Sequence, residues 1–236
     1  MSTLAEQVVE QLKTDMDNVY DAGYQKGKSE GGDSYYDTFW DVYQEYGKRI
    51  NYKYAFNSFW NDENFKPKYD IVPKDGSYLI NYSTITDLKA LLEKQGVVLD
   101  MSQATTCYCA FEGNKAWTSF PCIDISSCTN FGWAFGYNTK LETIEEIKGI
   151  QPACTWSQSF QDCTNLKNIK LTGSIGKSIS FGHSQYLTDE SIQNIIDVLM
   201  DKTGQTATVL TLHNNVKAKL TEEQIATITS KNWTLA

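Results

Sequence analysis

Histidine is scarce in this chain, with two residues, His183 and His213, among 236. Sites that use histidine as a general base or as a metal ligand therefore have few ways to form. Long apolar runs are also missing, because no stretch approaches the roughly 20 residues that a membrane-spanning helix needs. The N-terminal residues lack a basic region followed by an apolar core, so we expect no secretory signal. We predict no insertion into a membrane.

Positive charge is in short supply as well. Lysine and arginine number 21 against 29 aspartate and glutamate residues, which gives a net charge of −8 and a pI near 4.8. An acidic surface repels polyanions, so we expect neither nucleic acid nor an anionic membrane as a partner. Apolar residues make up 41% of the chain, enough for the core of one large domain or two small ones.

Recognisable catalytic motifs are absent. The sequence has no Gly-x-Ser-x-Gly elbow, phosphate-binding loop, dinucleotide fingerprint, His-Glu-x-x-His motif or EF-hand loop. Carboxylate pairs of the kind that hydrolyse glycosides carry no information in a chain with 29 acidic residues. We interpret both histidines as solvated or structural. The sequence therefore predicts a protein that is not an enzyme and that binds no cofactor.

Six cysteines lie within one 57-residue stretch, at positions 107, 109, 122, 128, 154 and 163. The paired Cys-x-x-Cys knuckles of zinc ribbons are missing. Disulfides and a metal site stay open as minor alternatives. Our main interpretation is that the cysteines are reduced, small core or turn residues, so we predict no metal.

The N-terminal region, residues 1–31, has the composition of one helix over residues 3–29. Its small and apolar residues are spaced alternately four and three apart, which is typical of a heptad seam. The seam residues are Ala5, Val9, Leu12, Met16 and Val19. A helix with so narrow an apolar stripe is only marginally stable on its own in water, so we expect the seam to join copies of the chain. A trimer is favoured, although the short seam does not fix the number of strands.

A connecting segment, residues 32–83, is rich in aromatic residues, with 13 of them between Tyr35 and Tyr69. Flat rings could form a surface that stacks on sugars or binds a protein. The alternative, which we favour, is a compact plug that closes the end of the next domain's core.

A repeat is the strongest signal in the sequence. Phe111, Phe135 and Phe160 are 24 and 25 residues apart. Each follows a small residue and is followed by Asn or Cys at plus three and by large apolar residues at plus six and plus nine. A unit of about 25 residues cannot bury its own apolar side. Successive units must therefore stack into a solenoid with a ladder of equivalent side chains as its core.

Residues 123–144, read as Ile-Asp-x-Ser followed by Thr-Asn-Phe-x-x-Ala-Phe and a spaced Leu-x-x-Ile, carry a family resemblance. They resemble the BspA-like leucine-rich repeats of bacterial surface proteins, and residues 160–169 are the closest single match. Similar repeats occur in phage and prophage proteins of Gram-positive gut bacteria. The resemblance implies an α/β fold with a short leucine-rich-repeat-like solenoid over residues 84–186.

Residues 187–236 are expected to close the solenoid as a helix-strand cap. Thr188 is a suitable N-cap for a helix that we expect to reach about Lys202. An alternating strand over 208–212 follows, and Thr221 with Gln224 predicts a capping box for a second helix. Residues 233–235 are predicted to form a final strand.

The resemblance, the seam, the acidic surface and the missing signal together favour a phage virion component of the tail-fibre or receptor-binding type. We expect it to be non-enzymatic, to assemble with other virion proteins and to recognise a glycan or protein on the host surface. A bacterial cell-surface adhesin is the alternative, and a glycan hydrolase is a weaker one.

The candidate contact residues lie at strand positions between the inward-facing columns. They are Tyr108, Trp133 and Gln158, with Trp117 as a fourth. Trp133 is aromatic where the neighbouring repeats carry Cys109 and Gln158, which fits a platform for a sugar. The alternative is that Trp133 fills a gap in the core.

Overall fold

The computed structural model describes residues 71–73, 75–83, 85–96 and 98–236. Short helices and parallel strands in two small sheets make up this part of the chain. The predicted N-terminal helix, with the seam Ala5, Val9, Leu12, Met16 and Val19, and most of the aromatic segment lie outside the described residues. Within them, no helix combines the length and the apolar character that crossing a membrane requires.

The first sheet is entirely parallel, and β3 (Thr143–Ile150) is its central strand. Strand β3 pairs with β1 (Ser119–Phe120), β2 (Ile123–Asp124) and β4 (Asn168–Gly173). Thr143 lies opposite both Ser119 and Asn168. The strands are therefore offset by the same 24 and 25 residues that separate the repeated phenylalanines.

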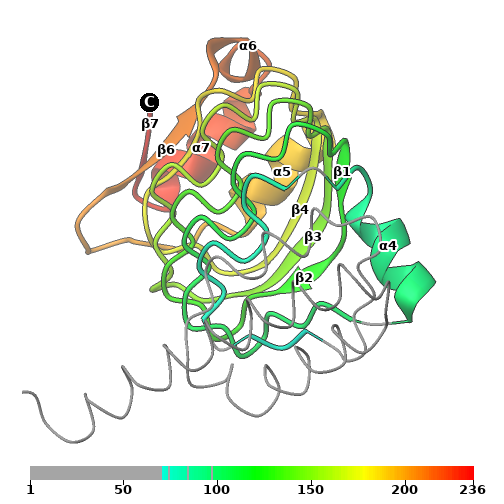
Figure 1. The fold of residues 1–236 in the computed structure, drawn as a ribbon. Helices are drawn as coiled ribbons and strands as arrows, with labels where there is room; N and C mark the ends of the chain where they lie inside the picture. Colours follow the sequence, from blue (N-terminus) through cyan, green and yellow to red (C-terminus); the bar gives the residue numbers. More distant parts are fainter. Residues whose placement is uncertain (1–70, 74, 84, 97) are drawn as a thin grey trace, which may run out of the picture. The chain divides into compact units, whose positions relative to one another are not determined.

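A second set of backbone hydrogen bonds joins the repeats on the flank away from these strands (Figure 1). The amides of Cys107, Cys109, Phe111 and Gly113 each donate to a carbonyl about one repeat further along the chain. The intervening amides instead close turns within their own repeat, as Ala134 does onto the Phe131 carbonyl. We call the four segments that carry this pattern the turn ribbon; they are residues 76–82, 106–113, 130–137 and 155–162.

Buried aromatic rings form the core between the two flanks. The ring centroids of Phe111 and Phe135 are 5.2 Å apart, and those of Phe135 and Phe160 are 6.1 Å apart. Phe181, from the incomplete fourth repeat, stacks on Phe160 at 4.7 Å. All four side chains are at most 1% exposed. The repeated phenylalanines thus lie in a single file.

Beside this file, a column of buried polar side chains satisfies the backbone of the turns. The Asn114 side-chain oxygen accepts from the amides of Ala116 and Trp117, at 2.7 and 2.9 Å. One repeat later, the Asn138 side chain donates to the Phe111 carbonyl at 2.8 Å. Cys163 occupies the next position, and its thiol donates to the Phe135 carbonyl at 3.0 Å. The predicted equivalence of Cys163 with the two asparagines is confirmed.

Helix α4 (Leu88–Gln95) precedes the first full repeat. Its start is fixed by Asp87, whose side chain accepts from the Ala90 amide. Its end is fixed by Gly96, which adopts a left-handed conformation with φ of 66°. Leu88 is fully buried, which anchors the helix.

The C-terminal sheet has the order β5-β6-β7 and is also parallel. Helix α5 (Asp189–Asp197) is capped by Thr188, as predicted, but it ends before Lys202. The helix stops early because Leu199 leaves it to form a bridge with Ile175. The predicted capping box of Thr221 and Gln224 is present at the start of α7. The remaining elements are β5 (Ile179–Phe181), β6 (Thr208–Leu212), α6 (Asn214–Lys217), α7 (Glu222–Ser230) and β7 (Trp233–Leu235).

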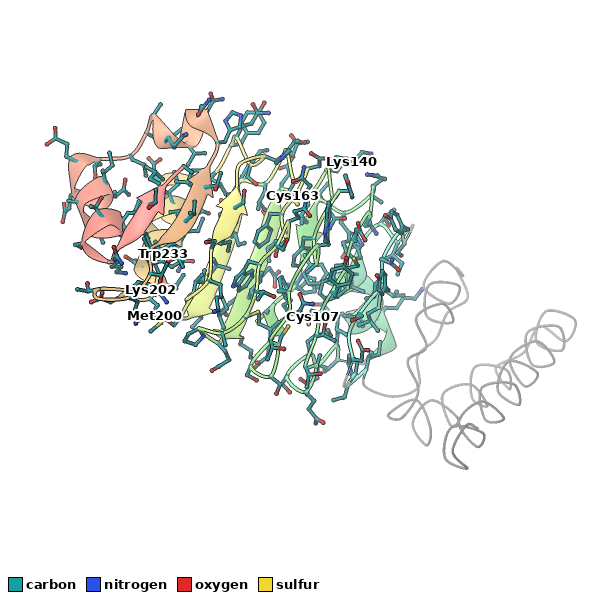
Figure 2. The ribbon with its side chains drawn as sticks, turned by 90° about the vertical axis from the view of Figure 1, so that its left-hand side faces the viewer. Cys107, Lys140, Cys163, Met200, Lys202 and Trp233 are labelled. Carbon is teal, nitrogen blue, oxygen red and sulfur yellow. The ribbon has the colours of Figure 1, made fainter. Side chains whose placement is uncertain are left out.

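Figure 2 shows these elements following the green and yellow strands of the first sheet in chain order. The Trp233 indole anchors the last strand by donating to the Met200 carbonyl at 2.8 Å. His213, which we predicted to be solvated or structural, caps α6 by accepting from the Asn215 amide through Nδ1.

Candidate functional site

Two columns of the turn ribbon have left-handed backbone. The first column contains Tyr78, Cys109, Trp133 and Gln158, with φ between 53° and 58°. The second contains Tyr82, Gly113, Tyr137 and Asp162, with φ between 52° and 75°. Only Gly113 is free of the steric penalty, which is roughly 1–2 kcal/mol for a residue with a Cβ atom. Bulky residues in this conformation are outliers, and strain of this kind gathers at functional sites.

Four aromatic rings lie in these columns, and Tyr108 directly precedes the column residue Cys109. We call these five rings the aromatic row: Tyr78, Tyr82, Tyr108, Trp133 and Tyr137. The Trp133 and Tyr137 rings stack with centroids 5.4 Å apart and planes inclined by 24°. Tyr78 and Tyr108 meet edge to face at 5.6 Å. Tyr82 is 59% exposed, and the other four side chains are half-buried. The row is therefore an accessible aromatic surface rather than part of the core.

Glycines beneath the row let the rings approach the backbone. A Cβ atom on Gly113 would lie 2.4 Å from the Tyr82 ring, and one on Gly136 would lie 2.8 Å from the Trp133 ring. Gly132 has the same relation to the Tyr108 ring, at 3.3 Å. Any larger residue at these positions would push the rings away. The positions of the rings therefore depend on the glycines beneath them.

Polar side chains continue the ribbon beyond Trp133. Gln158 is exposed, and four residues later Asp162 has a carboxylate oxygen 2.8 Å from His183 Nδ1. The Gln161 amide nitrogen lies 2.9 Å from His183 Nε2. Because the Gln161 amide nitrogen donates to Nε2, the proton lies on Nδ1 and is donated to Asp162. The hydrogen-bonding groups at this end of the ribbon are therefore held in a fixed orientation.

Glu112 is the buried acid under the row, with 7% of its surface exposed. Burial, followed by a hydrogen bond with Glu112, raises the pKa of the Cys109 thiol to about 12. Partial burial and the same carboxylate also raise the pKa of the Tyr82 phenol. Both groups are consequently uncharged at physiological pH and can donate hydrogen bonds.

Of the predicted contact residues, three lie on the ribbon and one does not. Tyr108 and Trp133 belong to the aromatic row, and Gln158 extends it. Trp117 is wrong as a surface contact, because it is 0% exposed and packs against Phe120 at 5.3 Å. It follows Asn114 by three residues, a position that points into the core in every repeat.

The sequence pattern did not predict three residues of the row as contacts, namely Tyr78, Tyr82 and Tyr137. Tyr78 and Tyr82 belong to a segment offset from the first full repeat by about 30 residues, so they did not align with its columns. Tyr137 follows Trp133 by four residues, just as Tyr82 follows Tyr78. This shared spacing of four residues is the sequence signal that could have identified the three tyrosines.

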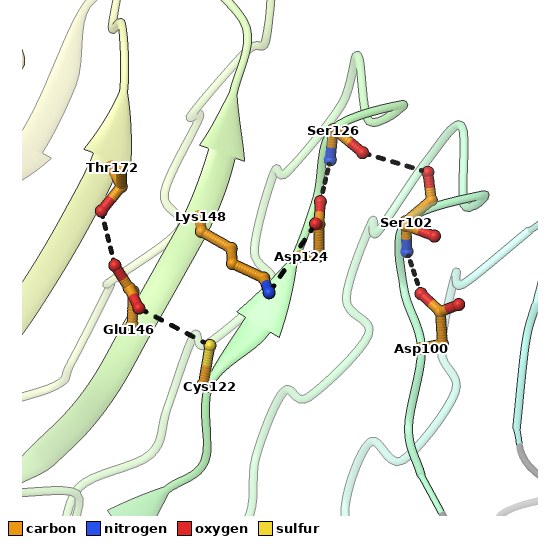
Figure 3. A network of polar contacts seen from close by, with 8 residues as sticks. All are labelled: Asp100, Ser102, Cys122, Asp124, Ser126, Glu146, Lys148 and Thr172. Carbon is orange, nitrogen blue, oxygen red and sulfur yellow. Dashed lines mark hydrogen bonds and ion pairs between the residues drawn. The ribbon is translucent and has the colours of Figure 1, made fainter.

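A pocket of about 430 Å³ opens on the strand side of the molecule. Its lining residues are Val72, Val98, Leu99, Asp100, Ser102, Cys122, Asp124 and Lys148. Asp100 and Asp124 each accept from the amide of a serine two residues further on, both at 2.9 Å (Figure 3). Lys148 lies 4.0 Å from the Asp124 carboxylate. The aspartates thus serve mainly to hold their own turns.

Cys122 is the exposed cysteine of the six, and its sulfur lies 3.8 Å from a Glu146 carboxylate oxygen (Figure 3). Partial burial and Glu146 raise the pKa of this thiol, although Lys148 opposes the shift. The thiol is therefore a weak nucleophile at neutral pH. Neither histidine lines the pocket.

The other five cysteines are buried and free. Cys128 lies between Cys107 and Cys154 and shares hydrogen bonds with both. Those bonds and burial raise the pKa of Cys107 and of Cys154, which keeps both protonated. In the described ranges, no group of three or more histidine, cysteine or acidic side chains is arranged to hold a metal ion.

The chain matches no protein-family model, no curated protein and no solved structure. Its function is therefore inferred from its own residues. Of the surfaces described, the turn ribbon combines exposed aromatic rings, backbone strain and a regular repeat.

Proposed function

We propose that the chain is a non-enzymatic recognition protein, a phage virion component of the tail-fibre or receptor-binding type that contacts the host surface through its turn ribbon. The observation that carries this proposal is the placement of Tyr78, Tyr82, Trp133 and Tyr137 at left-handed positions on an accessible surface. Such residues reduce stability, and contact with a ligand explains their presence. Aromatic residues also contribute strongly to binding.

The fold that we propose for this function is a short leucine-rich-repeat-like solenoid with a helix-strand cap. Three features support it. The parallel strands are offset by 24 or 25 residues, the repeated phenylalanines lie in single file, and a second hydrogen-bonded flank joins the same repeats. In a solenoid, equivalent surface positions form columns, which is what a recognition surface of repeated contacts requires.

Two other functions compete with this proposal. A bacterial cell-surface adhesin would use the same ribbon and would differ in location. A glycan hydrolase would need two carboxyl groups facing the bound sugar. Beside the aromatic row, Glu112 is buried and Asp162 is bonded to His183, which favours binding over hydrolysis.

We also propose that the chain is a homo-oligomer, with a trimer favoured, joined through the N-terminal seam and attached to other virion proteins. The support is the spacing of Ala5, Val9, Leu12, Met16 and Val19. Light scattering of the full chain and of a version without residues 1–31 tests it. The proposal requires the shorter chain to have the lower oligomeric state, and an unchanged state contradicts it.

Binding to cells tests the proposed function. Labelled full-length chain is added to Gram-positive gut bacteria, and the bound fraction is measured for wild type, Trp133→Ala and Tyr82→Ala. Ile225→Ala is the matched control, since Ile225 is an exposed apolar residue on α7 and lies outside the ribbon. We expect the two ribbon variants to lose binding while the control keeps it. Equal binding by all four proteins would show that the turn ribbon is not the recognition surface.

A further inference from the structure

The aromatic row and its polar surroundings also indicate what kind of ligand the ribbon takes. We propose that the ribbon binds a neutral glycan chain, with sugar rings stacked on Trp133 and Tyr137 and their hydroxyl groups bonded by Gln158 and its neighbours. This proposal rests on the proposed recognition function and adds the chemical class of the ligand.

The spacing of the row supports a chain of repeated units. Trp133 and Gln158 occupy the same position in successive repeats, and their backbones are joined by parallel hydrogen bonds. Neighbouring hydrogen-bonded strands lie about 4.8 Å apart, so equivalent contacts recur at that interval. Within each column an aromatic ring recurs in every second unit, Tyr78 and then Trp133, or Tyr82 and then Tyr137, so a polymer of ring-shaped units can meet one ring in every second unit. An irregular protein surface gains nothing from this regularity.

The polarity of the row favours sugars over an apolar partner. Exposed polar side chains lie on the same segments as the rings, among them Ser157 and Gln158. A pyranose has an apolar face of C–H groups and an edge of hydroxyl groups. Aromatic rings suit the face, and amide and hydroxyl groups suit the edge.

The charges near the row favour a neutral glycan. A phosphorylated or sulfated polymer would need a cluster of arginine or lysine side chains. Among the residues that the structure describes, Lys115 is the cation in contact with the row, 5.7 Å from the Tyr137 ring centroid and bonded to the Tyr137 carbonyl at 2.8 Å. The acids are buried or bonded, as Glu112 and Asp162 are. A neutral hydroxyl-bearing ligand therefore matches the surface.

The test compares two treatments of the cells that wild-type chain binds. Periodate cleaves the vicinal diols of sugars, and a broad protease removes surface proteins. We expect binding to fall at least about tenfold after periodate and to persist after protease. Binding lost to protease and kept after periodate overturns the glycan proposal and leaves the recognition function standing. Absence of binding to any untreated cell overturns both.

Ring-specific variants of the full chain sharpen this test. Trp133→Phe keeps a flat ring, whereas Trp133→Leu keeps apolar bulk without one. Using an array of neutral oligosaccharides as the probe, we expect Trp133→Leu to lose about tenfold or more in apparent affinity and Trp133→Phe to keep most of it. Melting temperatures close to that of wild type for both variants exclude misfolding. Equal affinity of the two variants overturns stacking at Trp133.

Discussion

At the residue scale, Trp133 combines a strained backbone conformation with an aromatic side chain on the accessible surface. Its φ of 58° is unfavourable for any residue with a Cβ atom. Trp133→Ala removes the ring and keeps that penalty, whereas Trp133→Gly removes both. We expect Trp133→Gly to be the more stable variant by about 0.5–1 kcal/mol in urea unfolding.

Thr129 provides the matched control for this comparison. It is exposed on the same repeat, and its φ is not left-handed. There the order should reverse, with Thr129→Gly less stable than Thr129→Ala by a similar amount. The same order at both positions would show that Trp133 carries no backbone strain.

The six thiols differ in accessibility, which gives a second prediction at this scale. Cys122 is exposed, and the other five cysteines are buried. We expect a maleimide to label the native chain at Cys122 and the remaining cysteines only after unfolding, as read by mass spectrometry. Because the pKa of Cys122 is raised, labelling should keep accelerating with pH beyond the ordinary thiol range. Rapid labelling of native Cys122→Ser would contradict the burial of the others.

At the element scale, the turns depend on buried polar side chains. Asn114→Ala would leave the buried Trp117 amide without its acceptor. Such a loss costs about 1–3 kcal/mol. Asn168→Ala, on an exposed position of β4, should change stability by less than about 0.5 kcal/mol. Chemical denaturation checks both, and similar effects of the two substitutions would refute the role of Asn114.

The same elements show what the sequence could predict. The cap at Thr188 and the capping box at Thr221 were predictable because each depends on residues within one turn. The early end of α5 was not, since it depends on Leu199 pairing with Ile175, a distant residue. The left-handed ribbon was missed for a related reason. Its left-handed conformation comes from hydrogen bonds between repeats. Trp133 and Tyr137, taken as single residues, would instead predict a negative φ.

At the scale of the whole molecule, stability depends on the file of buried phenylalanines. Phe135 contacts the rings of both Phe111 and Phe160. We expect Phe135→Ala to reduce the free energy of unfolding by about 3–5 kcal/mol. Phe135→Leu refills most of the volume and should cost far less. Thermal and urea unfolding measure both, and a loss below about 1 kcal/mol for Phe135→Ala would mean that the file is not the core.

The constant register of Thr106, Asn130 and Thr155 has a consequence for engineering. Thr106 bridges Asn130, and Asn130 bridges Thr155, so the unit that begins at Asn130 meets the same kind of edge on either side. In a tandem duplication of residues 130–154, the added unit would therefore pair with its neighbours through the same backbone register. The chain would be longer by one repeat, and its two ends would not need redesign. Under the proposed function, the length of polymer that the ribbon contacts would then increase with the number of units that the gene encodes.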